Sequence, residues 1–133
     1  MRRLIASGVL VLLVAGAVVA AAVPAPTPRK TIASYCSPSG DVCYGVVNRS
    51  GAVYFELTTF ARYFLRYRLC VRPPTGAVRC RTFAMRPAGR NWASVVRFAR
   101  NFRAAGPGVY RATWRLGSNR LGPTLRFRLP LRS

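Results

Sequence analysis

The sequence predicts an all-β protein, an antiparallel β-sandwich of about seven short strands. Apolar and polar residues alternate along many stretches of the chain, as expected where one side of a strand is buried and the other is solvated. Glycine, proline, asparagine and serine separate these stretches at regular intervals and mark turns. With 133 residues, the chain has room for one such domain and little more.

The clearest hairpin lies in Gly106–Leu129, which reads GPGVYRATWRLGSNRLGPTLRFRL. Two alternating stretches are joined here by a turn at residues 117–119. Apolar residues, among them Trp114 and Phe127, fall on one phase of the alternation, and arginines fall on the other. We therefore expect a half-buried antiparallel hairpin whose outer side is basic.

The approach to this hairpin, GPGVY at residues 106–110, indicates an immunoglobulin-like topology. In such sandwiches a tyrosine near the start of strand F hydrogen-bonds to the backbone across the preceding turn. Tyr110 is therefore expected to be buried, with its hydroxyl bonded to the backbone of the connection at 99–107. The hairpin would then supply strands F and G, the last two of the fold.

Five further strands precede the hairpin. They are predicted at Val42–Val47, Ala52–Thr59, Arg66–Arg72, Ala77–Met85 and Trp92–Phe98. An aromatic connection, Phe60–Leu65, joins the second of these to the third. We expect its three aromatic side chains to cap the open end of the sandwich. The alternative is an exposed patch that, together with Arg62 and Arg66, would bind carbohydrate or lipid.

The N-terminal residues have the pattern of a secretory signal peptide. Arg2 and Arg3 precede a long uncharged apolar run, and the alanines at 20–22 are the small residues that a signal peptidase reads. We assign residues 1–22 to a signal peptide, 23–30 to a stiff proline-rich linker and 31–133 to the folded domain. A secreted or envelope-associated protein is expected. An uncleaved membrane anchor is the alternative, because about 20 apolar residues can span a bilayer.

Four cysteines, Cys36, Cys43, Cys70 and Cys80, predict two disulfides in an exported chain. Of the three possible pairings we favour the two local ones, Cys36–Cys43 and Cys70–Cys80. The first pair encloses a run of turn formers, and the second flanks a hairpin that contains two prolines and a glycine. A zinc site is disfavoured because the cysteine spacing is wrong and histidine is absent.

Lysine and arginine together number 22, against two acidic residues, Asp41 and Glu56, for a net charge of +20. Histidine is absent, and the two carboxylates belong to different elements. The sequence thus lacks the groups that general acid–base or serine-nucleophile catalysis needs. We expect a protein that is not an enzyme and has no cofactor and no metal. A surface with so few carboxylates favours anionic partners instead.

The chain contains three distinctive segments: CSPSGDVC at 36–43, LCVRPPTGAVRC at 69–80 and GPGVYRATWRLGSNRLGPTLRF at 106–127. Together they resemble a group of small exported immunoglobulin-like proteins of high-GC Gram-positive bacteria. The resemblance implies a fold and an export route, and it implies no activity. One departure from antibody-type domains is clear: Ala112 stands where their strand F carries a cysteine, so the disulfide between strands B and F is missing.

In an immunoglobulin-like topology strands C, F and G are neighbours in one sheet, so their outward residues share one surface. On the predicted strands these are Arg66, Arg68, Arg72, Arg111, Arg115, Arg126 and Arg128. We call this set the arginine face. We expect it to bind polyanions, because guanidinium forks match the geometry of phosphate and carboxylate. If Cys70 pairs with Cys80, both point outward, which turns Arg79 and Arg81 to the other side of the sheet.

Two alternatives to a polyanion-binding module remain open. The arginines can instead reflect codon bias on a solvated sheet surface. The protein can also be a protein-interaction module, an inhibitor or accessory subunit, that presents the Cys36–Cys43 loop to one partner. The expected partners are thus an anionic polymer, a membrane or wall surface, or a protein. The sequence does not predict the oligomeric state.

Overall fold

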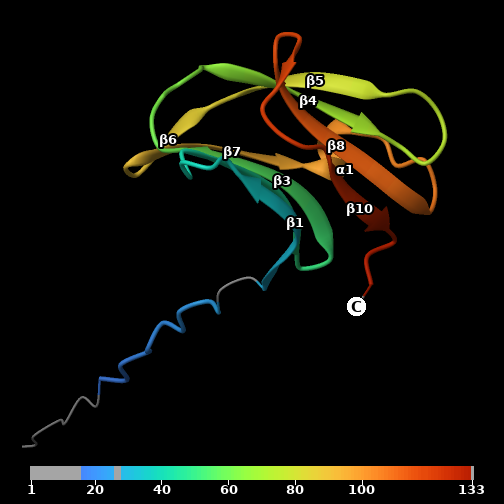
Figure 1. Ribbon diagram of the computed structural model, residues 1–133. Helices are drawn as coiled ribbons and strands as arrows, with labels where there is room; N and C mark the ends of the chain where they lie inside the picture. Colours follow the sequence, from blue (N-terminus) through green and yellow to red (C-terminus); the bar gives the residue numbers. More distant parts are fainter. Residues whose placement is uncertain (1–15, 26–27, 133) are drawn as a thin grey trace, which may run out of the picture.

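The computed structural model describes residues 16–25 and 28–132. Two five-stranded antiparallel sheets pack face to face (Figure 1). Sheet A has the order β1 (Arg29–Cys36), β2 (Val42–Arg49), β3 (Ala52–Thr59), β7 (Asn91–Arg97) and β6 (Arg86–Ala88). Sheet B has the order β10 (Leu125–Leu129), β8 (Gly108–Leu116), β4 (Arg66–Arg72) and β5 (Arg79–Ala84), with β9 (Asn119–Arg120) paired to β8. The predicted all-β sandwich is confirmed.

The core between the sheets is largely aromatic. Trp114 on β8 is fully buried and stacks on Tyr44 of β2, with 4.4 Å between the ring centroids. Phe55 on β3 meets Trp114 and Phe127 edge-on, at 5.9 and 5.6 Å. Burying each such side chain contributes about 1.5–3 kcal/mol. These contacts join sheet A to sheet B and hold β8 in the middle of the molecule.

The sequence does not predict two strands of sheet A. Strand β1 begins at Arg29, inside the segment assigned to the linker, so the folded domain starts before residue 31. Its alternation is weak because β1 lies at the sheet edge and its pairing with β2 shifts register between Thr31 and Ala33. Strand β6 is only three residues long and fully exposed, and it contains a proline. Neither strand carries the pattern of a half-buried strand.

The sequence predicts a continuous second strand for the closing hairpin. In the structure this strand is interrupted between β9 and β10. The four residues 121–124 lie opposite two residues of β8, because Arg120 pairs with Arg115 and Leu125 pairs with Ala112. Gly122 in this break packs against sheet A. A Cβ atom there would come within 2.5 Å of the Tyr35 ring. The break therefore lets the hairpin close one side of the sandwich.

Tyr110 lies at the start of β8 and is fully buried. Its hydroxyl donates a hydrogen bond to the carbonyl of Gly106 at 2.7 Å and accepts one from the backbone N–H of Ala105 at 2.8 Å. The connection it braces begins with a one-turn helix, α1 (Phe98–Asn101). The side chain thus ties the crossing from sheet A to the first strand of the closing hairpin.

All four cysteines form disulfides, in the pairs Cys36–Cys43 and Cys70–Cys80 that the sequence predicts. Each bridge joins neighbouring strands of one sheet, β1 to β2 and β4 to β5, and neither crosses the sandwich. Two disulfides point to an oxidising, extracellular environment.

The signal peptide prediction lies largely outside the described residues, which begin at residue 16. Residues 16–25 form neither helix nor strand and are exposed. Within the described part of the chain, no helix combines the length and the apolar character that crossing a membrane requires.

Candidate functional site

The alternation of β4 and β8 directs their arginines to the outer side of sheet B. Leu69 and Trp114 point into the core and are fully buried, so the neighbouring Arg68 and Arg115 point outward. The two arginines lie opposite one another in the register. Because the apolar side chains of β4 and β8 are buried in the core, the arginines that alternate with them lie on the outer side of sheet B.

The same register continues towards the other end of the sheet. Arg111 on β8 lies opposite Arg72 on β4 and Arg126 on β10. Arg111 therefore has an arginine opposite it on each of the neighbouring strands β4 and β10. These side chains are exposed, and they crowd cations on three adjacent strands.

The outer side of sheet B is hollowed, with a cavity of about 700 Å³. Five of the seven residues of the predicted arginine face line this hollow: Arg68, Arg72, Arg111, Arg115 and Arg126. Arg66 and Arg128 lie on the same outer side, exposed, but do not line it. We call the cavity the arginine hollow.

The residues of the hollow that sequence reasoning missed include Arg120, Thr113 and Thr124. The two threonine hydroxyls are hydrogen-bonded at 2.7 Å, which attaches the break before β10 to β8. Arg120 follows the turn and lies opposite Arg115. All three occupy the outward phase of the hairpin alternation, which was the signal that could have identified them.

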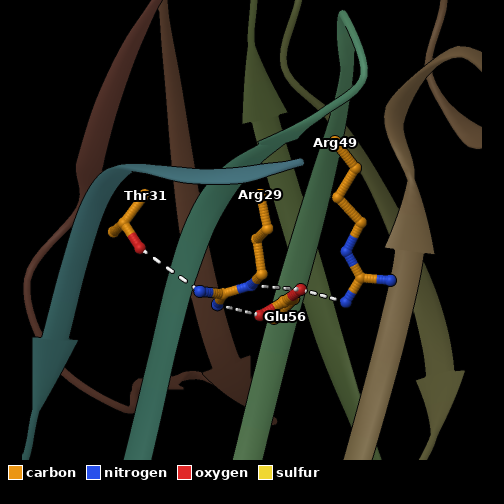
Figure 2. A network of polar contacts seen from close by, with 4 residues as sticks. All are labelled: Arg29, Thr31, Arg49 and Glu56. Carbon is orange, nitrogen blue, oxygen red and sulfur yellow. Dashed lines mark hydrogen bonds and ion pairs between the residues drawn. The ribbon is translucent and has the colours of Figure 1, made fainter. Parts of the chain in front are cut away.

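Neither carboxylate lies on the outer side of sheet B. Glu56 belongs to β3 of sheet A, where Arg29 and Arg49 both form ion pairs with it. Figure 2 shows the carboxylate between the two guanidiniums, with Arg29 also reaching the Thr31 hydroxyl. Burial alone would raise the pKa of Glu56, but the hydrogen bonds and charges of the two arginines outweigh burial and hold that pKa below its usual value. Asp41 lies in the loop between β1 and β2.

Arg79 and Arg81 on β5 lie outside the arginine hollow, because Cys70 and Cys80 are paired on its side of the sheet. Instead they line a second cavity of about 630 Å³ together with Arg100. Arg81 donates a hydrogen bond to the carbonyl of Asn101 at 3.1 Å. The edge of sheet B therefore carries a separate basic cluster.

The expected capping role is wrong for two of the three aromatic residues at 60–65. Phe60 is 67% exposed and Tyr63 is 53% exposed, whereas Phe64 packs against the core. The connection contains no regular structure, and the guanidinium of Arg62 lies over the Trp92 ring, 5.5 Å from its centroid. One end of the sandwich thus carries exposed aromatic side chains.

The arginine hollow can bind anions by charge-assisted hydrogen bonds. Glu56, the one acidic residue on a strand, is engaged by two arginines, and the described residues contain no group of three potential metal-binding side chains. Comparison with known proteins found no matching family model, no matching curated protein and no matching solved structure.

Proposed function

We propose that the protein is an exported, non-enzymatic binding module that holds polyanions in the arginine hollow of an immunoglobulin-like sandwich. One observation carries this proposal. The outer side of sheet B is concave and is lined by six arginines, while both carboxylates of the chain lie elsewhere. Cations gathered without neutralising partners create a strong positive potential, which attracts polymers of repeated negative charge.

The strand order supports the immunoglobulin-like part of the proposal. Strands β2, β3, β7 and β6 follow the order A-B-E-D, and β10, β8, β4 and β5 follow G-F-C-C′. Strand β1 is then an addition at the edge of sheet A. Tyr110 bonds to the backbone before β8, as the corner tyrosine of strand F does.

Export is supported by the two disulfides and by the signal-like sequence at residues 1–22. An exported protein with a net charge of +20 meets the anionic polymers and lipids of an envelope. This setting matches the ligand class that the arginine hollow favours.

Two triple variants of equal charge test the proposal. Arg68, Arg115 and Arg126 are changed together to Ser in one, and Arg86, Arg90 and Arg97 of the β6–β7 hairpin in the other. Binding of inorganic polyphosphate to the oxidised protein is measured over a range of salt concentrations. The first variant should lose about tenfold or more in affinity and show a shallower salt dependence, because each lost phosphate contact lowers the slope.

The control variant should stay close to the parent protein. Equal losses in both variants would mean that net charge alone drives binding, and the proposed site would then be wrong.

A second candidate function, a protein-interaction module, is favoured by the exposed end of the sandwich. The Cys36–Cys43 disulfide encloses a loop there, and the carbonyl of Asp41 in this loop accepts a hydrogen bond from the N–H of Phe60. Phe60 and Tyr63 are exposed beside it. Aromatic residues in such positions are typical of protein contacts. Stoichiometric, salt-resistant binding to one protein, lost in Phe60→Ser with Tyr63→Ser, would support this function.

A further inference from the structure

The pairing of the strands divides the arginine hollow into three rows that cross sheet B. One rim consists of Arg68, Arg115 and Arg120. The other rim consists of Arg72, Arg111 and Arg126. Between them lies a floor made of the Cys70–Cys80 disulfide, Thr113 and Thr124. The floor carries no charge, whereas each rim carries three arginines.

These rows form a groove of definite size. Arg111 and Arg115 are four residues apart on one strand, so the backbone atoms of the two rims are about 13 Å apart. The groove crosses β5, β4, β8 and the residues before β10, which gives a length of about 14 Å for three strand spacings. Arg115 of one rim donates a hydrogen bond to the carbonyl of Ser118 in the turn beyond it. The uncharged floor between the two rims therefore has room for one extended chain.

We infer that this groove holds a single phosphodiester chain running across the strands, and that the chain is a polyol phosphate without bases. The inference rests on the proposed function and specifies its ligand. A phosphodiester carries two non-bridging oxygens on opposite sides of the chain, so each oxygen can meet the arginines of one rim. A carboxylate of an acidic polysaccharide projects to one side of its sugar ring and can meet one rim only.

The floor argues against a nucleic acid single strand. Proteins that bind single strands without sequence preference stack the bases on aromatic side chains. Among the residues that the structure describes, none of those that line the groove is aromatic, and the floor offers a disulfide and two threonines. A chain of small polyol units needs no stacking surface, and its neutral parts can rest on this floor.

Filling the floor without changing the charge tests the groove directly. Thr113 is half-buried on the outer side of β8, where strand geometry accepts an aromatic residue. Thr113→Phe should weaken binding of poly(glycerol phosphate) about tenfold or more by obstructing the chain. Thr113→Val loses the hydrogen bond to Thr124 but has the same shape, and it should bind as the parent protein does. Thr124→Phe fills the floor from the other side and serves if Thr113→Phe does not fold.

The outcomes separate this inference from the proposed function. If the floor-filling variants bind unchanged while the Arg68, Arg115 and Arg126 triple variant loses affinity, the arginine face binds polyanions but the groove inference is wrong. If the triple variant also binds unchanged, the proposed function fails.

A comparison of probes with equal numbers of charges tests the chemistry of the chain. Poly(glycerol phosphate) should bind more tightly than a thymidine oligonucleotide or polygalacturonate. Equal or tighter binding of the oligonucleotide would contradict a base-free ligand, and equal or tighter binding of polygalacturonate would contradict the two-sided recognition of a phosphodiester.

Discussion

At the scale of single residues, Glu56 shows how sheet A differs from sheet B. This carboxylate is largely buried between Arg29 and Arg49, with a side chain 17% exposed. It neutralises part of the surface of sheet A, and sheet B has no equivalent. Because Glu56 belongs to sheet A and Asp41 to a loop, no acidic residue lies on the strands of sheet B.

Replacing Glu56 by Gln should destabilise the protein in a pH-dependent manner. The pKa of Glu56 is lowered in the folded protein, so its ion pairs stabilise the fold above the unfolded pKa of about 4.3 and lose that effect as the pH falls through the folded pKa. We expect a loss of about 1 kcal/mol at pH 7 that shrinks towards zero once the pH is below the folded pKa. Denaturant unfolding across this pH range measures it. A loss of the same size at both ends would contradict the ion-pair explanation.

Tyr110→Phe should lower the free energy of unfolding by about 1 kcal/mol, because the hydroxyl makes two hydrogen bonds to the backbone at Ala105 and Gly106. Tyr54→Phe, which removes a hydroxyl from the outer side of sheet A, is the matched control and should have little effect. Urea unfolding of the three proteins gives the comparison. If Tyr110→Phe is as stable as the parent, this contact does not brace the connection.

At the scale of elements, the break between β9 and β10 closes one side of the sandwich. Gly122 has no positive φ, so an alanine can adopt its backbone conformation, but the added Cβ would collide with Tyr35 and with the Tyr44 hydroxyl. Gly122→Ala should therefore cost about 1–3 kcal/mol. Ser118→Ala in the nearby turn should stay within about 0.5 kcal/mol of the parent. Thermal unfolding measures both. A fully stable Gly122→Ala would mean that the contact is not tight.

The sequence predicts those strands whose one side is buried and other side solvated. Strands β3, β4 and β8 alternate clearly because their inner residues fill the aromatic core. Strand β1 was missed because it is an edge strand with a shifted register, and β6 because it is short and exposed. The break at 121–124 was missed because alternation continues through it in the sequence, although Pro123 cannot donate a hydrogen bond there. The pairing of edge strands and the packing between sheets leave no periodic pattern in the sequence, so these features could not be predicted from it.

At the scale of the whole molecule, alternation predicts which arginines point outward but not which of them surround a cavity. Arg66 and Arg128 have the predicted orientation and lie beyond the arginine hollow, whereas Arg120 lines it. Which arginines line the arginine hollow depends on the curvature of the sheet and on the position of the 117–124 segment. Both depend on contacts between distant parts of the chain. The exposure of Phe60 likewise depends on how its connection joins the two sheets.

The central claim is that polyanions bind at the outer side of sheet B. Chemical-shift mapping of the oxidised, ¹⁵N-labelled protein with inorganic polyphosphate tests it most directly, because each arginine Nε–H reports on its own environment. We expect the largest shifts at Arg68, Arg111 and Arg115, and small ones at Arg86 and Arg97 of sheet A. Shifts spread evenly over both sheets, or confined to the Phe60–Leu65 connection, would contradict the claim.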